Sequence, residues 1–150
     1  MAGTPALPQE NIEPLPNVNT INVEEIRAEA GRQKVLQNRV ATYTRDTVER
    51  RVSQYFEDIP ILIQIARCES GFRQYDKYGE VLRGLVNSSD VGVFQINKYY
   101  HSDRAESLGL DLNTIEGNMA YARDLYNREG TQPWSASKKC WSGYREIAQK

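Results

Sequence analysis

DIPILIQIARCESGF, residues 58–72, is the stretch that decides the fold, because an apolar run in it leads directly into polar, chemically capable side chains. Asp58 is suited to cap a helix whose first turn holds Pro60, where the missing N–H of proline costs no hydrogen bond. The run from Ile59 to Ala66 is almost wholly apolar, so we expect this helix to be buried on all sides. Gly71 then ends the helix, which places the polar residues before it where a core helix meets a cleft.

Glu69 is the candidate catalytic residue, because it follows this apolar run and Phe72 comes three residues later. A carboxyl group acts as a general acid near neutral pH only if it is still protonated there. Apolar surroundings raise the pKa of a carboxyl group, since they disfavour its charged form. We therefore interpret Glu69 as a desolvated general acid. The alternative is an ordinary surface charge at the end of a helix.

The chain divides into a linker, a charged helix and a compact domain. Residues 1–20 hold four of the six prolines among polar residues, which is typical of a flexible linker. Residues 21–46 are predicted to form a charged helical extension, with a helix expected from Val23 to about Tyr43 and capped by Asn22. We expect a solvated spacer here; docking onto an envelope, secretion or phage assembly is the alternative.

The compact domain is expected over residues 47–150. It begins near Thr47, because apolar residues then recur at helical spacing: Val48, Val52, Tyr55 and Phe56. Turn residues around short β-prone runs predict a small hairpin within 74–96. A further helix is expected from Thr114, its cap, to Gly130, and one or two short helices after Trp134.

Two stretches, ARCESGF at 66–72 and SSDVGVFQIN at 88–97, resemble signature motifs of the lysozyme-like superfamily in order and separation. The resemblance covers about residues 47–142 and is to bacterial lytic transglycosylases, with animal-type lysozyme features in the second motif. It implies a mainly α (α+β) lysozyme-like fold, in which a small β-hairpin region lines a sugar-binding cleft. In that superfamily the Glu before Ser is the general acid, which implies this role for Glu69 and an orienting role for Ser70.

The resemblance also implies substrate-binding residues. The second motif would line the floor of the sugar cleft, where the alternative is an ordinary polar-edged strand; its residues are Gly92, Gln95, Ile96 and Asn97. Residues 118–126 look like the family's later helix, which implies a cleft position for Asn118. The family's cleft tyrosine corresponds to either Tyr121 or Tyr126, because Leu and Tyr stand in the reverse of the usual order, and either tyrosine is also suited to the core.

Flat aromatic side chains are a second requirement, because sugar rings stack their apolar faces on them. Tyr99 and Tyr100 follow the second motif directly, and Trp134 stands near the end of the domain. We interpret these three residues as candidate sugar platforms, with core packing as the alternative.

Asp90 decides which reaction is expected. A retaining hydrolase needs a second carboxylate about 5 to 5.5 Å from the acid, whereas an enzyme that uses the substrate's own acetamido group does not. Asp90 lies two residues before the motif glycine, as the second catalytic carboxylate of animal-type lysozymes does. Some bacterial transglycosylases also have Asp there, and the alternative is a turn residue that binds backbone amides.

The sequence thus predicts an enzyme that cleaves the β-1,4 bond between N-acetylmuramic acid and N-acetylglucosamine in peptidoglycan, as a lytic transglycosylase. The alternatives are a true lysozyme that uses Glu69 and Asp90, or an inactive wall-binding or assembly module. Neither reaction calls for a metal or an organic cofactor.

Composition and cysteines narrow the setting. The 19 basic and 20 acidic side chains nearly cancel, which disfavours nucleic-acid binding, and no apolar run is long enough for a membrane span. Cys68 and Cys140 form an even pair, for which we expect a disulfide; two buried thiols are the alternative. We expect a monomer that is secreted or in the cell envelope, with any signal peptide already removed.

Overall fold

The computed structural model describes residues 22–144, which are mainly helical with one small antiparallel sheet, as the α+β prediction requires. The predicted linker of residues 1–20 lies outside the described residues. In chain order the elements are α1 (Val23–Thr42), α2 (Arg45–Tyr55), α3 (Pro60–Ser70), β1 (Asp90–Val91), β2 (Ile96–Asn97), α4 (Lys98–Ser107), α5 (Ile115–Glu129), the 3-10 helix η1 (Gln132–Ser137) and α6 (Lys138–Trp141).

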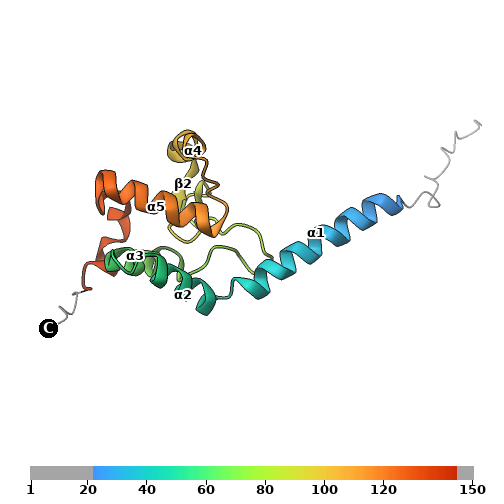
Figure 1. Ribbon diagram of the computed structural model, residues 1–150, viewed down its shortest axis with the longest axis horizontal. Coiled ribbons are helices and arrows are strands. Elements are labelled where there is room, and N and C mark those ends of the chain that lie inside the picture. The colour runs from blue at the N-terminus through green and yellow to red at the C-terminus, as the bar shows by residue number, and fades with distance from the viewer. Residues whose placement is uncertain (1–21, 145–150) are drawn as a thin grey trace, which may run out of the picture.

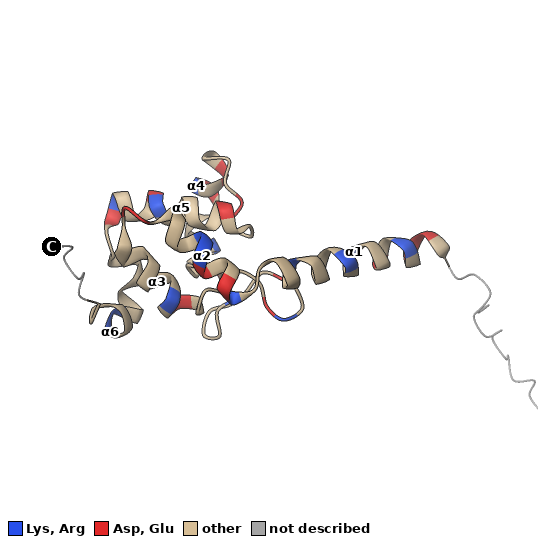
Figure 2. Ribbon diagram, turned by 60° about the horizontal axis from the view of Figure 1, so that its bottom comes forward, with Lys and Arg blue, Asp and Glu red and all other residues tan. Residues whose placement is uncertain are grey.

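Helix α1 confirms the predicted N-terminal helix and projects away from the other elements (Figure 1). The side chain of Asn22 caps it by accepting hydrogen bonds from the backbone N–H groups of Glu24 and Glu25, at 3.1 and 3.4 Å. No residue of α1 is buried; its acidic residues lie in the N-terminal part of the helix, and its basic residues continue toward the C-terminal end (Figure 2). Its C-terminal end contacts the rest of the protein, because the Arg39 guanidinium lies 5.1 Å from the ring centroid of Tyr75.

Helix α2 brings the first core residues, Val48, Val52 and Phe56, which are all fully buried. Tyr55, which belongs to the same apolar spacing, lies at the surface and stacks against the Arg123 guanidinium of α5 at 4.9 Å from its ring centroid. The helical spacing of this segment is therefore confirmed, with one of its four apolar residues outside the core.

Helix α3 differs from the prediction in two respects. Its N-cap residue is Ile59, with no side-chain cap, and Asp58 instead accepts two hydrogen bonds from Arg123, at 2.7 and 2.9 Å. The helix is also not buried on all sides, since only one face, which carries Leu62 and Ile65, is in the core. Asp58 forms a bidentate ion pair with α5 because a guanidinium offers stronger, paired hydrogen bonds than the helix end does.

The core lies where α2, α3 and α5 meet the hairpin and the two C-terminal helices. Helix α3 packs against α2, α6 and η1, and α5 also packs against η1 (Figure 1). Thr114 caps α5 as predicted, accepting a hydrogen bond from the N–H of Gly117 at 3.0 Å, and Gly130 ends the helix. The largest fully buried side chains are Tyr121, Phe56, Phe72, Phe94, Leu62, Ile65, Ile96, Ile115, Leu125, Gln74, Val48 and Val52.

The predicted hairpin is present as β1 and β2, which pair Asp90 with Asn97 and Val91 with Ile96. Helix α4, which sequence reasoning did not predict, follows it directly. The signal for α4 was Asn97, whose side chain accepts a hydrogen bond from the N–H of Tyr99 at 3.0 Å and so caps the helix.

Two buried amides hold the hairpin turn in place. Asn118 of α5 accepts a hydrogen bond from the N–H of Phe94 and donates one to the carbonyl of Val91, both at 2.9 Å. Gln74 accepts a hydrogen bond from the N–H of Val93 at 2.9 Å. Gly92 lies between these amides with φ of +73°, where a Cβ atom would come within 2.5 Å of the Asn118 amide and 2.6 Å of the Gln74 amide.

We therefore expect Gly92→Ala to destabilise the protein strongly. Alanine pays about 1–2 kcal/mol for the left-handed backbone, and overpacking against two buried, hydrogen-bonded amides adds about 1–3 kcal/mol. Gly109→Ala is the matched control, because Gly109 has φ of +69° but nothing within 4 Å of its Cβ position. Urea unfolding of both variants checks this, and equal losses of stability would contradict the role of the two amides.

Candidate active site

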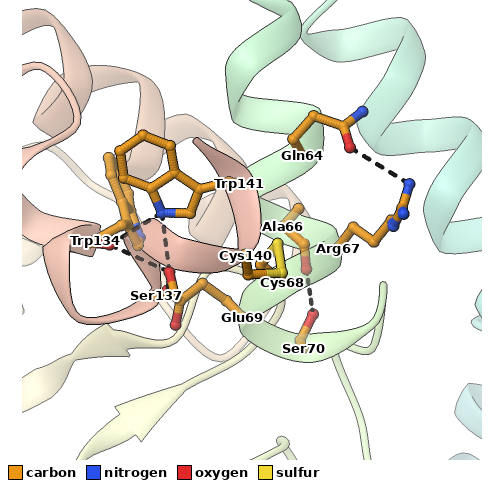
Figure 3. Close-up of a disulfide and its surroundings, with 10 residues drawn as sticks. All are labelled: Gln64, Ala66, Arg67, Cys68, Glu69, Ser70, Trp134, Ser137, Cys140 and Trp141. Atoms are coloured by element: carbon orange, nitrogen blue, oxygen red, sulfur yellow. Dashed lines mark hydrogen bonds between the residues drawn. A yellow bond between two sulfur atoms is a disulfide. The ribbon is translucent and has the colours of Figure 1, made fainter. Parts of the chain in front are cut away.

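Glu69 lies on the last turn of α3, just before Gly71 ends the helix with φ of +62°. Its side chain is partly buried, and the Ser137 hydroxyl donates a hydrogen bond to its Oε1 at 2.5 Å (Figure 3). Burial raises the pKa of Glu69; the Ser137 hydrogen bond opposes this rise, and the charge of Asp90 adds to it. Desolvation is the largest of these effects, as the apolar run before Glu69 predicts.

Two cavities meet at Glu69, with volumes of about 420 and 350 Å³. We call them together the Glu69 groove. The larger is bordered by Arg73 and the exposed Leu85, and the smaller by Tyr100, His101 and Trp134. The residues that line both cavities are Glu69, Asn87, Asp90 and Gln95. A separate cavity of about 730 Å³ lies between α2 and α5, and neither Glu69 nor Asp90 lines it.

Asp90 faces the Glu69 groove from β1. The Asn97 side chain, its partner across the hairpin, donates a hydrogen bond to the Asp90 carboxylate at 2.7 Å. This hydrogen bond fixes one oxygen of the Asp90 carboxylate. The side-chain amide oxygen of Asn97 is occupied as well, because it accepts a hydrogen bond from the N–H of Tyr99 and so caps α4. The second motif therefore brings Asp90 to the same groove as Glu69, so the structure places both predicted carboxylates together.

Gln95 and Ile96 also line the groove, from the hairpin turn and from β2. Gln95 has φ of +49°, and its side chain donates a hydrogen bond to the carbonyl of Gly92 at 2.9 Å. Ile96 is 2% exposed, so it contributes mainly to the core beneath the groove.

Several predicted site residues line neither cavity of the Glu69 groove, among them Gly92 of the hairpin turn. Ser70 is buried; its hydroxyl donates to the carbonyl of Ala66 and accepts from the N–H of Arg73, so it closes the helix end and does not orient Glu69. Asn118 and Tyr121 are fully buried, the first binding the hairpin backbone and the second the core. Tyr126 borders a different cavity, beside Ile59, Pro60 and Ile61.

The candidate sugar platforms occupy three different environments. Tyr99 is 82% exposed and lines neither cavity of the groove. Tyr100 is exposed and does line the smaller cavity, where it presents a flat ring to solvent. Trp134 lines the same cavity but is 3% exposed, and its indole N–H donates to the carbonyl of Phe94 at 3.0 Å. Tyr100 is thus the one of the three that is exposed and also lines the groove.

Sequence reasoning missed several residues in or near the site, among them Asn87, which lines both cavities of the groove. Ser137 comes from η1, 68 residues after Glu69, and no motif marks it. Gln74 is fully buried beneath the hairpin turn, although nothing in the sequence distinguishes it from the other polar residues of this segment. His101 borders the smaller cavity, with its Nδ1 2.9 Å from the Tyr121 hydroxyl. Burial lowers the pKa of His101, which favours a neutral ring.

The predicted disulfide joins Cys68 of α3 to Cys140 of α6. Cys68 directly precedes Glu69 in the chain, and Cys140 follows Ser137 by three residues, so the disulfide lies close to both side chains (Figure 3).

Within residues 22–144, no group of three or more His, Cys, Asp or Glu side chains is arranged to hold a metal ion. In this same part of the chain, no helix has the length and apolar character needed to cross a membrane.

No protein-family model matches the chain, and neither a curated protein nor a solved structure matches it.

Proposed function

We propose that this protein is a peptidoglycan glycosidase of the lysozyme-like superfamily, acting as a lytic transglycosylase with Glu69 as its general acid and base. One observation carries the proposal: a partly buried carboxyl group with a raised pKa ends an apolar helix and faces a groove that a second carboxylate also lines. The two sequence motifs support it independently, because each contributes one of these carboxylates.

The chemistry follows from the environment of Glu69. The raised pKa keeps the carboxyl group protonated nearer neutral pH, so that it donates a proton to the oxygen of the glycosidic bond as this bond breaks. Glu69 is then a carboxylate, and it accepts a proton from the muramyl 6-hydroxyl, which closes an anhydro ring. No water enters the product, and no cofactor takes part.

A second candidate function is a true lysozyme, because Asp90 lines the same groove. As a retaining hydrolase, the protein would use Asp90 as nucleophile and Glu69 as acid and then base. Against this, Asn97 already donates a hydrogen bond to one oxygen of the Asp90 carboxylate. This bond across the hairpin is also what a structural role of Asp90 in shaping the hairpin would require. The two reactions differ in their products, since only the transglycosylase leaves anhydro-muramyl ends.

Mass spectrometry of the fragments released from purified peptidoglycan tests the proposal. We expect anhydro-muramyl ends from the wild-type protein, and we expect Asp90→Asn to retain this reaction at a reduced rate. Removing the Asp90 charge lowers the pKa of Glu69, so the fall of activity at alkaline pH should begin at lower pH in the variant. Reducing ends, together with complete loss of activity in a folded Asp90→Asn variant, would favour the lysozyme.

We also propose that the protein works in an oxidising compartment, outside the cell or in its envelope. The Cys68–Cys140 disulfide supports this, because such bonds persist where thiols are not kept reduced. Helix α1 fits a spacer role there, since none of its residues is buried and its contacts with the domain lie in its C-terminal half, where Leu36 and Arg39 meet Gly79 and Tyr75. Docking of α1 onto a larger assembly stays a prediction.

A further inference from the structure

The hydroxyl group of Ser137 lies at the centre of a small hydrogen-bond network behind Glu69. It donates to Glu69 Oε1 at 2.5 Å and lies 3.2 Å from the carbonyl oxygen of Trp134. The indole N–H of Trp141 donates to the Ser137 hydroxyl at 3.0 Å and to the same Trp134 carbonyl at 3.1 Å. Figure 3 shows these groups beside the disulfide.

The hydrogen-bond partners of Ser137 limit where its hydroxyl proton can point. The indole of Trp141 can only donate, so Ser137 accepts at that contact and has its own proton free for another partner. The two acceptors within reach are Glu69 Oε1 and the Trp134 carbonyl, and the Glu69 contact is the shorter. A hydrogen bond to a carboxylate is also stronger than one to a neutral carbonyl. Ser137 is therefore aimed at Glu69 when Glu69 is charged.

The covalent frame keeps this network close to Glu69. Cys68, the residue before Glu69, is bonded to Cys140, which lies on the short helix that follows Ser137. Trp141 is 7% exposed and Trp134 is 3% exposed, so both indoles are held by the core. Ser137 thus approaches Glu69 from a part of the chain that the disulfide and two tryptophans fix.

We propose that Ser137 is a positioning residue for Glu69, whose Oε1 it fixes so that Oε2 is left to exchange the proton with the substrate. The inference rests on the proposed function and names a residue that neither motif contains. Ser137 also stabilises the charged form of Glu69, which burial alone disfavours. The proposed cycle needs both forms, because Glu69 acts first as an acid and then as a base.

The test compares Ser137→Ala, Ser137→Thr and the control Ser135→Ala, which removes an exposed hydroxyl from the same 3-10 helix. We measure the pKa of Glu69 by carboxyl carbon NMR, assigning the signal through its absence in Glu69→Gln, and the pH dependence of peptidoglycan turnover. In Ser137→Ala we expect a higher pKa for Glu69, an alkaline limit of activity that moves to higher pH, and turnover at the optimum lower by about tenfold or more.

Threonine keeps the hydroxyl group, so we expect Ser137→Thr to restore the wild-type pKa and alkaline limit, while Ser135→Ala changes neither. A purely structural role for Ser137 would lower activity without moving the alkaline limit or the pKa, and this result would overturn the inference. A different result would be the expected pKa shift in Ser137→Ala together with no peptidoglycan turnover by the wild-type protein. This result would contradict the proposed function, while leaving the hydrogen bond between Ser137 and Glu69 established.

Discussion

Replacing Glu69 by glutamine is expected to lower the turnover of peptidoglycan by about 10²–10⁴-fold, the range over which a positioned general acid and base accelerates a reaction. The amide has nearly the same shape as the carboxyl group, and its oxygen still accepts the hydrogen bond from Ser137. It offers no ionisable proton at the pH of the reaction, however. We therefore expect Glu69→Gln to fold normally and to bind glycan strands, and to release soluble fragments only at this strongly reduced rate.

The measurement is the initial rate of release of soluble fragments from purified peptidoglycan, with sedimentation of insoluble peptidoglycan as the assay for binding. Glu106→Gln is the matched control, because Glu106 lies exposed on α4 and lines neither cavity of the groove. Equal turnover by wild type and Glu69→Gln would remove Glu69 from the reaction. Binding without turnover in the wild type would identify the protein as an inactive wall-binding module.

Local signals made much of the fold predictable. Asn22 and Thr114 cap α1 and α5 as expected, because a side chain two or three residues from its partner needs no tertiary structure to reach it. Gly71 ends α3 for a similar reason, since the left-handed conformation there suits a residue without a side chain. The end of α3 at Gly71 places Glu69 on the last turn of that helix, whereas the hairpin that carries Asp90 is held by the distant side chains of Asn118 and Gln74. The pairing of Glu69 with Asp90 was predicted from the two motifs and not from these helix ends.

Contacts between distant segments were beyond sequence reasoning. Asp58 is next to a helix start and reads as a cap, yet Arg123 of α5 binds it across the fold. Ser70 is next to Glu69 in the chain, but helix geometry directs its hydroxyl back to the carbonyl of Ala66. The orienting hydroxyl comes instead from Ser137, 68 residues later, through a packing arrangement that no periodicity encodes.

The choice between core and cleft for aromatic and amide side chains failed for the same reason. Asn118 was expected in the cleft, and Tyr121 was one of two candidates for the cleft tyrosine, with the core as the alternative. Both are fully buried, because α5 turns this face to the hairpin and the core. A helical pattern shows which residues share a face, but the neighbouring elements decide what that face meets. Asn118 still acts on the site, through the turn that presents Gln95 and the strand that carries Asp90.

Removing the disulfide is expected to cost about 4 kcal/mol of folding free energy. Cys68 and Cys140 are 72 residues apart, and a link across so long a loop removes much conformational entropy from the unfolded chain. A small domain is stable by only about 5–15 kcal/mol, so this is a large share of the total. Urea unfolding of the oxidised wild type, the reduced wild type and the double variant Cys68→Ala/Cys140→Ala measures the loss.

The reduced wild type and the double variant should lose similar stability, and a reducing agent should leave the double variant unchanged, which makes it the internal control. A loss of folding free energy below about 1 kcal/mol would contradict a stabilising role for the disulfide, because the entropy of the closed loop alone predicts several times more. The same samples separate two roles of the bond. If the folded double variant keeps the wild-type pKa of Glu69, the two tryptophans suffice to hold Ser137 in place, and the disulfide acts on stability. If the pKa rises as in Ser137→Ala, the disulfide also holds Ser137 against Glu69, and reduction impairs the reaction before it unfolds the protein.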